Sequence, residues 1–113
     1  MIKTKTENGI QKVTNDNGEV AVIIHPSFGG GWYSWKGEIE ILFHPEIVIW
    51  ILNGKPKDVK IDVAKILNNE YRDMDYISDL EVVWIKEGEE FRVREYDGAE
   101  WIEIKSETKW ITA

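Results

Sequence analysis

The chain has 113 residues, and its 14 basic and 21 acidic side chains give a net charge of −7. This length predicts a single domain over residues 1–113. The absence of cysteine excludes disulfides, thiol catalysis and cysteine-based metal sites. No apolar run is long enough to span a membrane, and the acidic balance argues against binding nucleic acid through its phosphates. Since no apolar signal region follows the first residues, we expect a cytoplasmic protein.

The first third of the chain has the pattern of an antiparallel meander. Its β-branched composition, with 16 Ile and 9 Val against 4 Leu, favours sheet. Strands are predicted over residues 2–6, 10–14 and 19–24. The Asn8-Gly9 pair between the first two strands is a strong hairpin signal, and a second turn is expected at 15–18.

The middle of the chain carries the predicted helices. Residues 25–35 contain three consecutive glycines and are expected to form a loop. The apolar run 45–53 fits a buried strand or a buried helix. Its flanking Pro45 and Gly54 favour a short helix. A second helix over 59–70, capped by Asp58, is predicted from one apolar stripe.

The last third of the chain returns to strands, predicted over 80–86, 90–96 and 99–105. Asp97-Gly98 predicts a type I′ turn between the last two of them, and 110–111 is expected to add an edge strand. The whole pattern predicts an α+β fold, with antiparallel sheets and two helices packed on one face.

The glycine-rich aromatic loop is the first candidate site. Its glycines, Gly29, Gly30 and Gly31, expose backbone N–H groups of the kind that form anion-binding nests. The aromatic rings around them can stack on a planar ligand; they are Phe28, Trp32, Tyr33 and Trp35. The alternative is that the glycines turn the chain while the tryptophans fill the core.

The second candidate site is an arginine pair on the strand predicted at 90–96. Arg92 and Arg94 are two of only three arginines, and their spacing places them on one face of the strand, opposite Phe91 and Val93. Such a pair could hold an anion bidentately, together with Tyr96 and Asp97 at the turn. The alternative is a cross-strand ladder with glutamates such as Glu81, Glu100 or Glu103.

The remaining polar clusters give weaker signals. The two histidines, His25 and His44, are too few for a metal site without acids from elsewhere, so no metal or other cofactor is expected. An acid–base role for either of them is the least favoured hypothesis. The whole charge imbalance lies after residue 68, where six bases face thirteen acids. The dense acidic stretch there is a solvated face or, alternatively, a surface that binds a partner protein through Asp73, Asp75, Asp79 and Glu81.

Three motifs together resemble a family of small uncharacterised phage and prophage proteins. The motifs are the loop 28–35, the Leu-Phe-His-Pro segment 42–45, and the run Phe-Arg-Val-Arg-Glu-Tyr-Asp-Gly at 91–98. The chain departs from the family pattern at Gly30, where alanine is usual, and at Tyr33, where a small hydroxyl residue is usual.

The resemblance implies a protein of the host-cell cytoplasm but no established reaction. By analogy with other small phage proteins, we expect a non-catalytic counter-defence factor that sequesters a nucleotide-derived signal, as a homo-oligomer. Blocking a host defence protein through the acidic surface is the alternative. The aromatic side chains Trp50, Trp84, Trp101 and Trp110 exceed what one small core needs, which also favours self-association.

Overall fold

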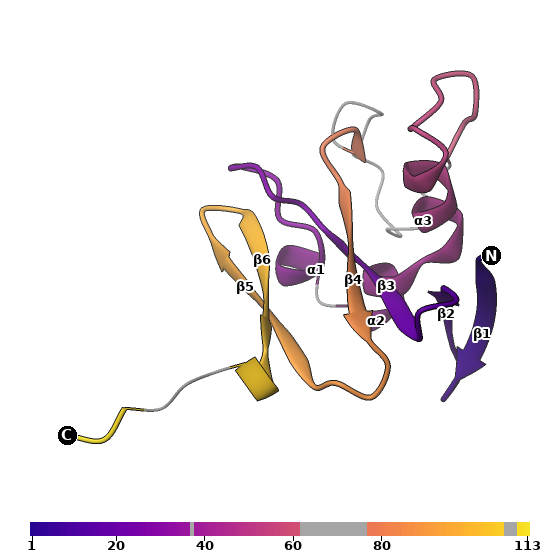
Figure 1. Cartoon of the computed structure of the whole chain (residues 1–113). Coiled ribbons are helices and arrows are strands. Elements are labelled where there is room, and N and C mark those ends of the chain that lie inside the picture. Colours follow the sequence, from indigo (N-terminus) through magenta and orange to yellow (C-terminus); the bar gives the residue numbers. More distant parts are fainter. Residues whose placement is uncertain (37, 62–76, 108–110) are drawn as a thin grey trace.

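The computed structural model describes residues 1–36, 38–61, 77–107 and 111–113. Its strands form two antiparallel sheets, a four-stranded one in the order β1-β2-β3-β4 and a two-stranded one, β5-β6 (Figure 1). The strands are β1 (Lys3–Glu7), β2 (Ile10–Thr14), β3 (Glu19–Ile24), β4 (Glu81–Lys86), β5 (Phe91–Tyr96) and β6 (Ala99–Ile104). The helices are α1 (Tyr33–Lys36), α2 (Ile39–Phe43), α3 (Pro45–Leu52) and the 3-10 turn η1 (Lys105–Glu107).

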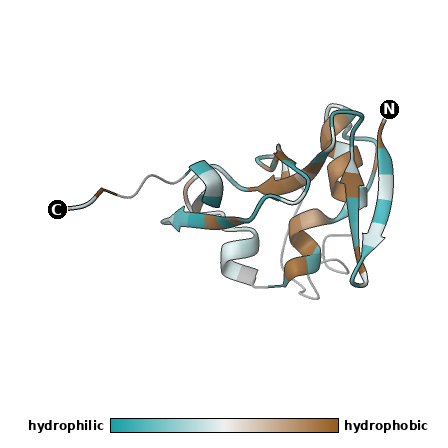
Figure 2. Ribbon diagram, turned by 60° about the horizontal axis from the view of Figure 1, so that its bottom comes forward, coloured by the Kyte–Doolittle hydropathy of each residue, from teal (hydrophilic) through white to brown (hydrophobic). Residues whose placement is uncertain are grey.

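The central strand β3 separates two apolar clusters because its side chains alternate between the faces of the sheet. On one face, Ala21 and Ile23 join a cluster that includes Ile47 and Val48 of α3. On the other face, Val22 packs in a cluster with Leu42 and Phe43 of α2, and the inward side chains of the β5–β6 hairpin cover it. Figure 2 shows the hydrophobic colour concentrated on the central strands and on α2 and α3, whereas β1 is mostly hydrophilic.

Helix α2 contributes to both clusters because it packs against both β2 and β3. Within the described ranges, strands β2 and β3 pair only at Thr14 and Val20, and α2 packs against both strands. Its Ile41 therefore joins the first cluster, while its neighbour Leu42 joins the second. The second cluster is therefore the place where the hairpin packs on α2 and on one face of the four-stranded sheet.

The α+β class with antiparallel sheets is confirmed, and most predicted strands are confirmed to within one residue. The helix interpretation of 45–53 is also confirmed, with Pro45 in its first turn. The loop predicted over 25–35 is wrong at its end, because this segment ends in the single turn α1. Helix α2 was not predicted.

The predicted helix over 59–70 does not begin at Val59, because residues 59–61 are not helical, and its remainder lies outside the described residues. Of the expected edge strand at 110–111, Ile111 is not in a strand and Trp110 lies outside the described part. Among the residues that the structure describes, no helix has the length and apolar character needed to cross a membrane.

The glycine-rich loop packs directly on the tip of the β5–β6 hairpin. Gly29 donates its backbone N–H to the carbonyl of Asp97 at 2.7 Å, and Gly31 donates to the carbonyl of Gly98 at 2.8 Å. Asp97 and Gly98 both have positive φ angles, 50° and 84°, as a type I′ turn requires. The turn therefore both reverses the chain and offers its carbonyls to the loop.

Replacing Gly98 tests this contact. A Cβ at position 98 would lie 2.8 Å from the backbone nitrogen of Gly30, so G98A must push the loop away. Gly88 offers a matched control, since its φ is also positive, 90°, and a Cβ at position 88 would meet nothing within 4 Å. We expect G88A to lower the free energy of unfolding by about 1 kcal/mol and G98A to lower it clearly more, by chemical denaturation. Equal losses would contradict the close packing of loop and turn.

Candidate functional site

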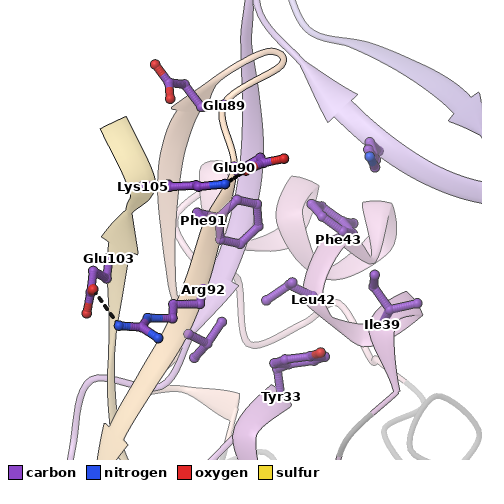
Figure 3. Close-up of a pocket in the computed structure, with 12 residues that line it drawn as sticks. Tyr33, Ile39, Leu42, Phe43, Glu89, Glu90, Phe91, Arg92, Glu103 and Lys105 are labelled. Carbon is purple, nitrogen blue, oxygen red and sulfur yellow. Dashed lines mark hydrogen bonds and ion pairs between the residues drawn. The ribbon is translucent and has the colours of Figure 1, made fainter. Parts of the chain in front are cut away.

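A groove of about 800 Å³ lies between strand β5 and helix α2 (Figure 3). Leu42 and Phe43 of α2 lie across it from Phe91 of β5, and the rings of Phe43 and Phe91 meet edge to face with centroids 6.3 Å apart. The apolar floor consists of Tyr33, Ile39, Leu42, Phe43, Phe91 and Val93. A volume of this size suits a drug-sized molecule or a few amino acid residues.

The rim of the groove carries both signs of charge, from Lys12, Glu89, Glu90, Arg92, Glu103 and Lys105. Arg92 donates to the Glu103 carboxylate at 2.8 Å, and Lys105 donates to Glu90 at 2.7 Å (Figure 3). The Lys105 ammonium lowers the pKa of Glu90, chiefly through this hydrogen bond. On the opposite wall, the Lys12 ammonium lies 4.7 Å from the centre of the Phe43 ring. The rim is therefore charged but internally paired.

The predicted glycine and tryptophan site lies at the hairpin tip and in the core. Gly29 and Gly31 use their N–H groups on the hairpin carbonyls, as described above. Trp32 is fully buried, and its indole N–H donates to the carbonyl of Ile41 at 2.8 Å. A Cβ at Gly30 would lie 1.9 Å from the His25 ring, so alanine there would need that ring to move.

The exposed aromatic residues of the motifs cluster near the same tip. Phe28 and Tyr96 are both about 70% exposed, and their rings meet edge to face at 6.4 Å. The Trp35 indole covers Gly31 so closely that a Cβ at position 31 would lie 2.1 Å from the ring. Of the aromatic residues of the loop 28–35, Tyr33 alone lines the groove, from its position at the start of α1.

The two predicted arginines form the ladder that was the alternative interpretation. Glu103 lies opposite Arg92 in the register of β5 and β6, and both Arg92 and Arg94 are within ion-pair distance of its carboxylate, at 2.8 and 3.5 Å. They differ in position, since Arg92 lines the groove and Arg94 does not. The structure thus brings together Tyr33 and Arg92 from the predicted set.

A buried carboxylate that the sequence did not single out joins the loop, α1 and the hairpin. Glu100 on β6 is 3% exposed. One oxygen accepts the backbone N–H of His25 at 2.8 Å, and the other accepts the backbone N–H and the hydroxyl of Ser34 at 2.8 and 2.6 Å. The backbone N–H of Glu100 also donates to the carbonyl of His25. Nothing in the sequence distinguishes this glutamate from the other acids.

Neither histidine lines the groove. His25 is 3% exposed, and its Nδ1 lies 3.0 Å from the carbonyl of Ser27. His44 connects α2 to α3, and its buried Nδ1 has no hydrogen-bond partner among the described residues. Burial lowers the pKa of His44, against an opposing effect of the Glu46 carboxylate. Neither ring is therefore placed where an acid–base catalyst would meet a substrate in the groove.

The predicted acidic surface is described only at its end. Asp79 and Glu81 are exposed, and the Asp79 carboxylate lies 3.9 Å from Nε2 of His25. Asp73 and Asp75 lie outside the described residues. Within the described ranges, no three acidic or histidine side chains gather closely enough to hold a metal ion.

The surplus tryptophans are distributed between the core and the surface. Trp50 is buried and Trp84 half-buried, whereas Trp101 is 46% exposed; Trp110 lies outside the described residues.

Comparisons with family models, with curated proteins and with solved structures find no match to this chain. The resemblance to phage proteins therefore stays a prediction.

Replacing the Glu100 carboxylate tests its role as the connection between loop and hairpin. In E100Q the amide group would turn a donor toward one of the three bound donors, and we expect a loss of about 2 kcal/mol in the free energy of unfolding. E103Q removes a half-buried carboxylate from the same strand, one that pairs only with exposed arginines, and should cost less than about 1 kcal/mol. Chemical denaturation measures both. A cost for E100Q no larger than that for E103Q would contradict the assignment.

Proposed function

We propose that this protein is a non-catalytic binding protein that holds its ligand in the groove between β5 and α2. The observation that carries the proposal is the combination of an apolar floor, half of it aromatic, with a rim of charged side chains on both walls. Binding sites typically combine such a floor with a few polar groups that orient the ligand. Neither His25 nor His44 lines this groove.

The paired rim charges remain available to a ligand. The side chains of Arg92 and Lys105 are 64% and 77% exposed in their ion pairs with Glu103 and Glu90. Exposed pairs of this kind contribute little to stability, so either partner can turn toward a ligand at little cost. The groove can therefore accept negative or positive groups at its rim while its floor holds an apolar part.

Blocking the groove with a bulky side chain tests the proposal. Ile39 lines the groove and is 44% exposed, whereas Ile49 on α3 is 42% exposed and does not line it. The probe is anilinonaphthalene sulfonate, which combines a flat apolar ring system with an anionic group. We expect I39W to abolish the probe's fluorescence enhancement and I49W to retain it. Equal enhancement in the two variants would overturn the proposed site.

A nucleotide-derived signal is the second candidate ligand, because Tyr33 and Arg92 of the predicted set line the same groove. The phenol ring of Tyr33 would stack on a base, while Arg92 and Lys105 would hold phosphate oxygens. In the phage setting that the motifs imply, such a binder would act by sequestering a host signal. Homo-oligomerisation belongs to the same proposal, whereas blocking a host defence protein through the acidic surface is the alternative to it.

A pair of arginine variants tests the nucleotide candidate. Arg92 and Arg94 share Glu103, but only Arg92 lines the groove. With a panel of cyclic nucleotides and ADP-ribose derivatives, R92A should reduce the ligand-induced rise in melting temperature, and R94A should leave it unchanged. If no compound in the panel raises the melting temperature of the wild-type protein, the nucleotide candidate is excluded.

A further inference from the structure

Among the residues that the structure describes, strand β5 has a neighbouring strand on only one of its two edges. It belongs to a two-stranded sheet in which β6 is its partner. Tyr96 and Ala99 flank the two-residue turn and therefore form a hydrogen-bonded pair. Along an antiparallel ladder, hydrogen-bonded pairs alternate with pairs whose backbone groups point away from the partner strand. The N–H and C=O groups of Phe91 and Val93 therefore point away from β6. The same alternation predicts that the backbone N–H of Glu100 on β6 points away from β5. The structure agrees, because this N–H donates to the carbonyl of His25.

This free edge borders the groove. Five consecutive residues, 89–93, line the groove, whereas β6 contributes Glu103 and its extension contributes Lys105. Consecutive lining residues come from both faces of β5, so the strand presents its edge to the space. In the part of the chain that the structure describes, no other segment bonds to the outward backbone groups of Phe91 or Val93.

The wall opposite this edge is a helix. Ile39, Leu42 and Phe43 of α2 face β5 across the groove, with Phe43 touching Phe91 at the base (Figure 3). A strand edge supplies donors and acceptors at the spacing of an extended backbone, and an apolar wall beside it supplies pockets for alternate side chains.

We propose that the groove takes an extended peptide segment of a partner protein, which adds to the sheet as a strand beside β5. The inference rests on the proposed function and names the ligand class of the same groove. Side chains on one face of the peptide would lie on the floor between Leu42 and Phe43, so apolar or aromatic residues are expected there. Lys12, on the wall opposite β5, calls for an acidic residue beside them.

Lys12 gives an acidic residue of such a segment a partner within the groove. The Lys12 ammonium lies over the Phe43 ring, at the point where a floor-bound side chain would end. It also pairs with the exposed carboxylate of Glu7 at 3.3 Å, a weak pair that an incoming carboxylate can replace. At the other side, the N–H and C=O groups of Phe91 and Val93 would be bonded by the peptide backbone.

The test begins with peptides of about twelve residues selected from a random displayed library on the full-length protein, a length that exceeds the strand. Fluorescence polarisation then measures each selected peptide on wild type, I39W and I49W. We expect peptides that bind wild type and I49W alike and lose binding to I39W. Selection that yields no peptide able to distinguish I39W from I49W would overturn the inference.

A methyl scan of the peptide backbone separates strand addition from other modes of binding. N-methylation at alternate positions removes the donors that face β5, and we expect each such methyl group to weaken binding by about fivefold or more. Methyl groups at the interleaved positions should change affinity by less than about twofold. Affinity that does not respond to N-methylation at any position would contradict pairing with the edge of β5.

The dye experiment keeps this inference distinct from the proposed function. If anilinonaphthalene sulfonate distinguishes I39W from I49W and no peptide does, the groove binds ligands but the peptide inference is overturned. If neither the dye nor any peptide distinguishes the two variants, the proposed function is overturned as well. If a nucleotide of the panel displaces the dye and no selected peptide does, the ligand class is a nucleotide instead.

Discussion

The groove depends on how the β5–β6 hairpin is held against the rest of the molecule. Near its tip, the Glu100 carboxylate accepts hydrogen bonds from His25 and from Ser34, which belong to the end of β3 and to α1. At the turn itself, the carbonyls of Asp97 and Gly98 accept the N–H groups of Gly29 and Gly31. Since the hairpin forms one wall of the groove and α2 the other, these contacts fix the position of one wall relative to the other.

This arrangement gives the glycine-rich loop a structural role. A buried carboxylate is costly unless its oxygens are hydrogen-bonded, and the loop and α1 supply three donors to Glu100. The glycines are needed for close approach, because side chains at positions 30 and 31 would collide with the rings of His25 and Trp35. The same loop places Tyr33 at the start of α1, where its ring forms part of the groove floor. The motif therefore acts on the groove by positioning its walls.

Local signals made much of the fold predictable from the sequence. Asn8-Gly9 and Asp97-Gly98 require positive φ angles that the structure has, and alternating side chains identified Arg92 and Phe91 as lying on opposite faces. Helix α2 was missed because five residues carry too little periodicity, and its stability comes from packing against β2, β3 and the hairpin. The separation of β5–β6 from the other sheet could not be predicted locally either, since nothing within β4 itself indicates that it pairs with β3 and not with β5.

The candidate site was harder to predict than the fold. Arg92 and Tyr33 were recognisable by residue type, but the floor residues Ile39, Leu42 and Phe43 look like ordinary core residues in the sequence. Glu100 lies 75 residues from its partner His25, so only the folded chain distinguishes it from the other acids. A strand edge that borders a groove cannot be predicted from the sequence, because it depends on which strands pair with one another in the folded chain.

The loop amides are bonded to the hairpin, and amide hydrogen exchange at Gly29 and Gly31, followed by NMR, measures this directly. We expect both amides to exchange slowly, and we expect E100Q, which weakens the same junction, to speed their exchange. Exchange of both amides at the rate of an unstructured peptide in the wild-type protein would contradict it, and the groove would then lack a fixed wall.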